Sequence, residues 1–172
     1  MNTPPLRTGE KIRFAFGTFS LGIALVATSA DGIVAILMGD SEEGLRRELA
    51  AAFPHAVADV TGLVDTVTKV TAFLDAPSNK FPLPLDLRGS EQEQAIWRAL
   101  SQIPTGETKT YGEIAKSLPI PATAQDVGAA CAANHLAVAI PCHRVVKANG
   151  SISGYRWGVN RKCKLINREA LA

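Results

Sequence analysis

The sequence predicts an α+β fold, in which a small β-sheet forms the N-terminal part and helices form most of the C-terminal part. Within residues 11–38, β-branched and aromatic residues alternate or run together on both sides of the turn signal Ala30-Asp31-Gly32, which is typical of strands. Within residues 90–133, apolar residues recur at helical spacing between capping residues and prolines. A composition of 47% hydrophobic and 20% charged residues over 172 positions is that of a globular chain with a buried core.

Residues 1–88 are expected to form an N-terminal mixed α/β domain. Ser41 can cap a helix that carries Glu42 and Glu43 in its first turn, where acidic side chains interact favourably with the helix dipole. A proline-rich connection follows the second expected helix. The expected strands are 11–17, 21–28, 33–38 and 85–87, and the expected helices begin at Ser41 and span 59–75.

Residues 89–172 are expected to form a C-terminal helical domain. Two pairs have the spacing of a capping box, Ser90 with Glu93 and Thr110 with Glu113. A break that contains two prolines ends the second helix near Leu118, and Thr123 begins a third helix that runs to about Ala133. Two short helices joined in this way match a helix-turn-helix, although ordinary packed helices fit the same pattern.

The sequence argues against a membrane protein, a secreted protein and a metal site. It holds no run of 18 apolar residues, and its first residues lack the apolar segment of a signal peptide, so we expect a cytoplasmic protein with no membrane partner. The three cysteines have no CxxC spacing and the histidines are scattered, which indicates neither a disulfide framework nor zinc. Nothing resembles a phosphate-binding glycine loop, and we expect no cofactor.

The net charge of +2 is unevenly distributed along the chain. Residues 1–89 hold eight basic and ten acidic residues, whereas residues 90–172 hold ten basic and six acidic residues. A basic half suits a polyanion, because phosphate contacts release counterions from nucleic acid. A solvated basic surface is the alternative reading of the same charges.

The stretch Pro141–Val146 carries the most chemical information. It places Cys142 directly before His143, after a proline that restricts the backbone. A thiol reacts as the thiolate, and an adjacent imidazole can accept its proton. A Cys-His pair by itself is weak support for a nucleophile, so the rest of the chain has to decide its meaning.

Four stretches together have the pattern of one family: Gly106–Tyr111, Ala130–Asn134, Pro141–Val146 and Ser153–Val159. On these residues the chain resembles the O6-alkylguanine-DNA alkyltransferases, also called methylated-DNA–protein-cysteine methyltransferases, and above all the C-terminal half of bacterial Ada. The resemblance implies an N-terminal ribonuclease-H-like sheet domain and a C-terminal DNA-binding domain with a helix-turn-helix. It also implies a DNA repair enzyme that acts as a monomer on double-stranded DNA containing O6-alkylguanine.

The resemblance assigns the catalytic roles to four residues. Cys142 takes the alkyl group, normally methyl, from O6 of a guanine flipped out of the duplex, and the resulting thioether is not hydrolysed, so each molecule acts once. His143 is the base, acting through a water, and Glu169 orients its imidazole. Asn134 is the hinge residue between the recognition helix and the acceptor segment, and a simple helix cap is its other interpretation.

The resemblance also implies a set of substrate- and DNA-binding residues. Tyr111 is expected to crowd the phosphate of the flipped nucleotide, Tyr155 to hydrogen-bond the flipped base, and Val145 to offer a backbone carbonyl to the base edge. The other expected members of this set are Thr110, Gln125 and Arg156. Cys131 and Cys163 are expected to be packing residues rather than nucleophiles.

One stretch departs from the family pattern. Gln125-Asp126 stands where the family has Arg-Ala, and that arginine normally fills the space that the guanine leaves. Gln125 is uncharged and Asp126 adds a negative charge that phosphates would repel. We therefore expect weakened base flipping or DNA binding.

Other interpretations stay open on the sequence. A non-repairing alkyltransferase-like protein would bind damaged DNA without accepting the alkyl group, but such proteins replace the acceptor cysteine that is present here. A degenerate member of the family with poor repair activity is the intermediate alternative, which Gln125 favours. A cysteine hydrolase or thiol redox enzyme would need an oxyanion hole or a resolving cysteine, and the sequence shows neither.

Overall fold

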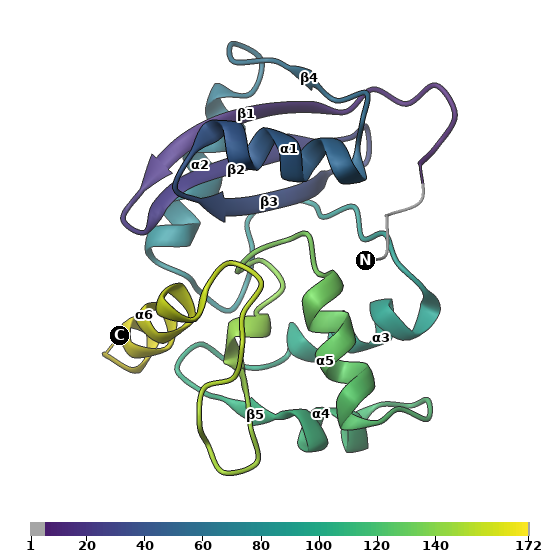
Figure 1. Cartoon of the computed structure of the whole chain (residues 1–172), viewed down its shortest axis with the longest axis vertical. Coiled ribbons are helices and arrows are strands. Elements are labelled where there is room, and N and C mark those ends of the chain that lie inside the picture. Colours follow the sequence, from purple (N-terminus) through teal and green to yellow (C-terminus); the bar gives the residue numbers. More distant parts are fainter. Residues whose placement is uncertain (1–5, 172) are drawn as a thin grey trace. The chain divides into compact units, whose positions relative to one another are not determined.

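Residues 6–171 are described by the computed structural model, and they belong to two units that are treated separately below (Figure 1). The first unit contains residues up to Ala76, Lys80–Arg88 and the short segment His135–Ala137. The second contains Pro77–Asn79, Gly89–Asn134 and Val138 onwards. Strands lie mainly in the first unit and helices in the second, so the expected α+β class is confirmed.

A four-stranded sheet with the order β3-β2-β1-β4 forms the first unit. The strands β1 (Arg13–Phe19), β2 (Gly22–Thr28) and β3 (Ile33–Gly39) are antiparallel neighbours, and the two-residue β4 (Val57–Ala58) runs parallel to β1. The first two strands are joined by a tight turn, which fixes their register from Phe19 opposite Gly22 to Arg13 opposite Thr28. The three strands expected from the sequence are thus present.

Two helices cover the sheet on opposite faces. Figure 1 shows α1 (Glu42–Ala52) in front of the strands and α2 (Val64–Asp75) behind them. Strand β3 is accordingly buried from Ile33 to Met38, as expected for a strand with both faces covered. Gly17 makes the close approach of α2 to β1 possible, since a Cβ there would lie 2.6 Å from Val67 Cγ1.

The free edge of β3 is covered by two irregular segments. Leu85 forms a parallel bridge with Ile33, and Leu136 forms another with Ile36. The Ile36 amide donates to the His135 carbonyl at 2.7 Å, and the Ala137 amide donates to the Ile36 carbonyl at 3.0 Å. Backbone that would otherwise be an unpaired edge is satisfied in this way. The expected strand over 85–87 is therefore wrong in extent, because this segment is a single bridge.

The expected helix over 59–75 is too long at its N-terminal end. Val57 and Ala58 pair with β1, and the Asp59 amide donates to the Phe14 carbonyl at 2.9 Å. The Asp59 carboxylate then accepts from the Gly62 amide at 3.0 Å, which makes a local turn instead of a helical one. The helix begins at Val64.

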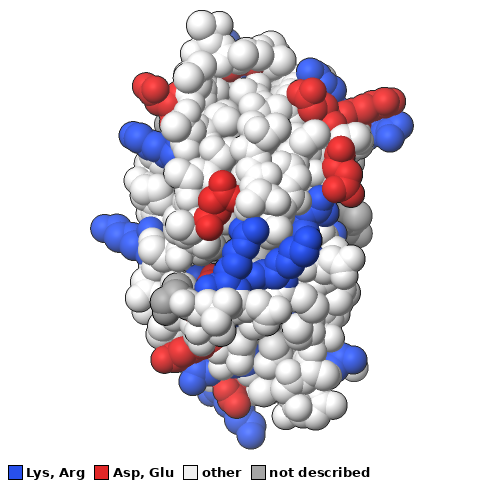
Figure 2. Space-filling model, turned by 90° about the vertical axis from the view of Figure 1, so that its left-hand side faces the viewer, with Lys and Arg blue, Asp and Glu red and all other residues white. Residues whose placement is uncertain are grey.

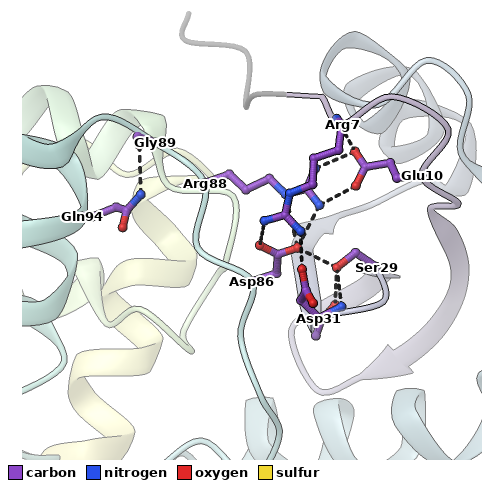
Figure 3. Close-up of polar contacts among 9 residues, drawn as sticks. Arg7, Glu10, Ser29, Asp31, Asp86, Arg88, Gly89 and Gln94 are labelled. Carbon is purple, nitrogen blue, oxygen red and sulfur yellow. Dashed lines mark hydrogen bonds and ion pairs between the residues drawn. The ribbon is translucent and has the colours of Figure 1, made fainter.

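The buried side chain of Arg88 joins the segment Lys80–Arg88 to other parts of the first unit (Figure 3). Arg88, only 7% exposed, donates to both oxygens of Glu10 at 2.7 and 2.6 Å and to Asp86 at 2.8 Å. Asp86 also accepts from the Ser29 hydroxyl at 2.6 Å and from Arg7 at 3.3 Å. Charge-assisted bonds of this bidentate kind are stronger than neutral ones. The cluster holds segments from the start, the middle and the end of the first unit.

Replacing Arg88 by alanine should destabilise the protein by about 3–5 kcal/mol, because Asp86 would stay buried without its main countercharge. Arg47→Ala is the matched control, since the Arg47–Glu43 pair is exposed and contributes at most about 1 kcal/mol. Urea unfolding of the two variants and the parent measures the difference. Equal unfolding midpoints for Arg88→Ala and Arg47→Ala would contradict the importance of the cluster.

Capping residues define the helices of the second unit. Ser90 and Glu93 form both bonds of the expected capping box, and the Gln94 amide side chain donates to the Gly89 carbonyl at 3.0 Å (Figure 3). Thr110 accepts from the Glu113 amide at 3.1 Å. The elements in chain order are α3 (Glu91–Leu100), β5 (Lys109–Thr110), α4 (Tyr111–Ser117), α5 (Ala124–Ala133), the 3₁₀ turn η1 (Cys142–Arg144), β6 (Val145–Val146) and α6 (Val159–Leu171).

The helices α4 and α5 pack on each other and are separated by residues 118–123, which is the expected helix-turn-helix arrangement. Strands β5 and β6 make a short parallel pair that the sequence did not indicate, with Lys109 opposite Val145 and Thr110 opposite Val146. This pair connects the start of α4 to the residues that follow Cys142. In the part of the chain that the structure describes, no helix is long and apolar enough to cross a membrane.

Candidate active site

Cys142 begins the tight 3₁₀ turn η1 and is 3% exposed. Its amide donates to the Ile140 carbonyl at 2.7 Å, and the Arg144 amide donates to the Pro141 carbonyl at 2.9 Å. Val138, just upstream, has a φ of 66°, a left-handed conformation that is strained for a β-branched residue. The turn η1 is therefore preceded by an irregular and buried segment.

Asn134 connects the recognition helix to this turn. It follows the last residue of α5, and its side-chain amide donates to the Ile140 carbonyl at 3.2 Å and to Cys142 Sγ at 3.3 Å. Its own carbonyl accepts from Arg156 at 2.6 Å. Asn134 thus ends the helix and also contacts the thiol.

His143 and Glu169 form a buried pair, with Nε2 of the imidazole 2.8 Å from Oε1 of the carboxylate. A carboxylate only accepts, so Nε2 carries the hydrogen and Nδ1 has a free lone pair. Nδ1 is buried and, among the residues described, has no hydrogen-bond partner. Burial lowers the pKa of His143 in spite of the opposing effect of Glu169, and the imidazole is therefore neutral at pH 7 and able to accept a proton.

Arg144 is the second partner of Glu169. Its Nε and one terminal nitrogen each donate to the carboxylate at 2.9 Å, and its other terminal nitrogen donates to the Ile103 carbonyl at 2.8 Å. Burial raises the pKa of Glu169, but the hydrogen bonds from His143 and Arg144 outweigh it and hold that pKa at about 2. Glu169 is thus ionised, and its orientation is fixed from two sides.

The helix α6 presents three buried residues to the site, Lys162, Leu165 and Glu169. Their spacing of three and four residues places them on one stripe of the helix, which packs on η1. Lys162 is only 1% exposed, and burial lowers its pKa, whereas the nearby thiols raise it. A buried ammonium on this stripe favours the ionised form of a thiol beside it.

The Cys142 thiol is surrounded by groups that favour its thiolate. A hydrogen bond with the Cys131 thiol and one from Asn134, together with the charge of Lys162, lower the pKa of Cys142 against the effect of burial. The same bond and burial raise the pKa of Cys131, so Cys131 keeps its proton and is the donor. All three cysteines are free thiols. Cys131 is therefore a polar partner of Cys142 as well as the packing residue that we expected.

Two expected substrate-binding tyrosines lie near this centre. Tyr111, the first residue of α4, shares a hydrogen bond with the Ser153 hydroxyl, and Ser153 accepts from Lys162 Nζ at 2.9 Å. The Tyr155 hydroxyl is buried and has no hydrogen-bond partner within residues 6–171. Its ring packs edge-on against Trp157 with centroids 5.4 Å apart. Burial raises the pKa of both tyrosines, so both are protonated at neutral pH.

The remaining expected residues are placed at the ends of elements around the turn. Val145 is fully buried in β6, and Thr110 caps α4. The Arg156 guanidinium lies 5.2 Å from the centre of the Trp157 ring. Gln125 is exposed in the first turn of α5, outside the hydrogen bonds described above.

Asp126 has a local role that the sequence analysis missed. Its carboxylate accepts from the Thr123 amide at 2.8 Å, and the Thr123 hydroxyl accepts from the Asp126 amide at 3.1 Å. This is a complete capping box at the N-terminus of α5, where a negative charge also interacts favourably with the helix dipole. The charge at this position thus serves the helix start.

Arg144, Lys162 and Ser153 are the members of the site to which the sequence analysis gave no role. Lys162 could have been found from its spacing, since it lies three residues before Leu165 and seven before Glu169 on one helix face. Ser153 had no such signal, because its contacts come from residues distant in the sequence. On the face drawn in Figure 2, Lys and Arg side chains lie among Asp and Glu side chains, so charge alone does not outline a binding surface there.

Comparison with known proteins agrees with this geometry. Residues 91–171 match the family model described as the DNA-binding domain of 6-O-methylguanine DNA methyltransferase. The methylated-DNA–protein-cysteine methyltransferase of Mycobacterium bovis is 40% identical over 115 residues, which are 67% of this chain and 70% of that protein. The chain belongs to this family. The chain is also similar to the crystal structure of Mycobacterium tuberculosis OGT in complex with DNA, with a TM-score of 0.76 and 31% identity. The match covers 94% of this chain and 93% of the OGT chain.

A further relative is a larger protein. The bifunctional transcriptional activator and DNA repair enzyme Ada of Escherichia coli is 46% identical over 162 residues, which are 92% of this methyltransferase-family chain. The chain spans less than half, 46%, of the length of Ada. The expected similarity to Ada is therefore confirmed over one part of that protein.

Replacing Glu169 by glutamine should lower the free energy of unfolding at neutral pH. It should also make that free energy less dependent on pH in the acid range. The carboxyl has a pKa of about 2 in the fold and 4.5 as its ordinary value, so its contribution is present above pH 4.5 and is lost as the pH falls towards 2. The shift corresponds to about 3 kcal/mol. Urea unfolding between pH 5 and 2.5, with Glu43→Gln as an exposed control, measures it. A parent and a Glu169→Gln variant that lose stability in parallel would contradict the assignment.

Proposed function

We propose that the protein repairs DNA by transferring the alkyl group of O6-alkylguanine, normally methyl, irreversibly to Cys142. The observation that carries the proposal is the arrangement of a buried thiol, a neutral His143 with a free Nδ1 and an ionised Glu169 within one turn and one helix. This is a nucleophile, a base and an orienting acid. The family to which the chain belongs supports the same reaction.

The proton of the thiol leaves first. Nδ1 of His143 accepts it through one intervening water, and the Nε2 bond to Glu169 stabilises the imidazolium that forms. The hydrogen bonds from Asn134 and Cys131 and the charge of Lys162 stabilise the thiolate at the same time. The resulting sulfur anion is a soft nucleophile held at a defined position.

Sulfur then attacks the alkyl carbon. The S–C bond forms as the C–O6 bond breaks, and its electron pair stays on the guanine. The guanine takes up one proton from water, and His143 returns the thiol proton to water, so the charges balance. The product thioether has no leaving group that water could displace, so the protein is used once. The buried Tyr155 hydroxyl, which has no partner among the described residues, supports a role in holding the flipped base by a hydrogen bond.

DNA is the partner that the fold supports. The helix-turn-helix α4–α5 places Tyr111 and Gln125 at the starts of its two helices, where such motifs contact nucleic acid. Extrusion of the guanine costs a few kcal/mol and has to be compensated by the protein. The cytoplasmic, monomeric state that we expect from the sequence completes the proposal.

The protein should gain the mass of one methyl group when it is mixed with duplex DNA containing O6-methylguanine. Intact-mass spectrometry measures the gain, and peptide mapping should place it on Cys142. The Cys142→Ala variant should gain nothing, whereas Cys163→Ala, which removes a half-buried thiol, should react as the parent does. DNA binding without any mass gain in the parent would favour a non-repairing damage-binding protein.

Gln125→Arg should accelerate the reaction with methylated duplex DNA by roughly tenfold, since a cation at the start of α5 would add one phosphate or base contact of about 1–3 kcal/mol. The exposed position of Gln125 lets the longer side chain be accommodated without repacking. Single-turnover rates at fixed salt measure the effect. Gln102→Arg, also exposed but after α3, is the control for added charge. Equal rates for Gln125→Arg and the parent would show that Gln125 does not limit base delivery.

A further inference from the structure

A chain of three polar groups lies beside the acceptor thiol, and each comes from a different segment. Tyr111 starts α4, Ser153 lies in the loop before α6, and Lys162 lies on the buried stripe of α6. Ser153 Oγ accepts from Lys162 Nζ at 2.9 Å and shares a hydrogen bond with the Tyr111 hydroxyl. The loop residue is thus the central member of the chain.

Hydrogen-bonding capacity explains why a hydroxyl stands at this position. An ammonium group can only donate, so it occupies one lone pair of Ser153. The remaining lone pair and the proton of Ser153 are available to Tyr111, whose hydroxyl can donate or accept. A backbone carbonyl could serve the ammonium, but it could not also donate to the tyrosine.

The position of the ammonium matters for the chemistry. Lys162 is 1% exposed, and a long flexible side chain in such a place loses free energy unless its charge is hydrogen-bonded. The Lys162 charge acts on the Cys142 thiol, and helix α6, which carries Lys162, packs on η1. Coulomb attraction inside a protein falls with distance, so the position of the ammonium determines the size of this effect. An ammonium that lost its fixed partner would move away from the thiol or lose its proton.

We propose that Ser153 is a positioning residue for alkyl transfer, because its hydroxyl holds the Lys162 ammonium beside the Cys142 thiol and joins it to Tyr111. Ser153 contacts neither the alkyl group nor the sulfur in this role and acts through Lys162. The inference rests on the proposed function of Cys142 as the acceptor, but it concerns the ionisation of that thiol and can be tested without DNA.

The test measures how the rate at which iodoacetamide alkylates Cys142 depends on pH. It uses the whole chain, and mass spectrometry of the Cys142 peptide follows the reaction. In Ser153→Ala the midpoint should move to higher pH by about 0.5–1 unit, and the rate at pH 7 should fall roughly three- to tenfold, since a hydrogen bond to a charged group is lost. Ser151→Ala is the matched control, because Ser151 lies in the same loop and its hydroxyl bonds to the nearby Asn149 side chain. Its profile should equal that of the parent.

Two further comparisons separate positioning from packing. Ser153→Thr keeps the hydroxyl and Ser153→Val has nearly the same shape without it, so the threonine variant should retain the parent profile and the valine variant should follow Ser153→Ala. In the background of Lys162→Met, removal of the Ser153 hydroxyl should cause no further shift, since the two residues act as one unit. Circular dichroism confirms that the compared variants are folded.

The outcomes are distinct. An unchanged midpoint in Ser153→Ala, equal profiles for the threonine and valine variants, or additive shifts of Ser153→Ala and Lys162→Met would each overturn the proposal. If iodoacetamide reports the expected shifts but methylated DNA transfers no methyl group to the parent, the positioning role stands and the proposed repair function fails. The two hypotheses are therefore tested separately.

Discussion

The second unit depends on the hydrogen bonds that His143 and Arg144 both make to the Glu169 carboxylate. One oxygen contacts both the imidazole of His143 and the guanidinium of Arg144, and the other accepts from Arg144 alone. Because Arg144 also binds the Ile103 carbonyl, a single buried anion connects α6, the acceptor turn and the loop after α3. Gly106 lets that loop come close, since a Cβ there would lie 3.2 Å from the Glu169 carbonyl.

Charge balance in this interior explains how a buried thiol can become an anion. A lone thiolate at 3% exposure would be strongly disfavoured by desolvation. The site supplies one ammonium and two neutral donors around the sulfur, while the carboxylate of Glu169 is occupied by its own cation and imidazole. Each anion therefore has its own partner, and neither competes with the other. The reactive form is stabilised by groups that exist before any substrate arrives.

The sequence predicted the parts of the molecule that local chemistry determines. The strands of the sheet and the Ser90 capping box follow from periodicity and from neighbouring residues. The helix over 59–75 was wrong at its start because Asp59 bonds to a strand that is distant in the sequence. The contacts of Arg144 and Ser153 could not be predicted for the same reason, since their partners are brought together by tertiary packing alone.

The pairing of His135–Ala137 with Ile36 has a consequence for modularity. These three residues lie between Asn134 and the strained Val138, on the short stretch that joins the recognition helix to the acceptor cysteine. The sheet of the first unit thus supplies backbone partners to this stretch. Recombination that exchanged the sheet for an unrelated fold would leave this segment without its backbone hydrogen-bond partners.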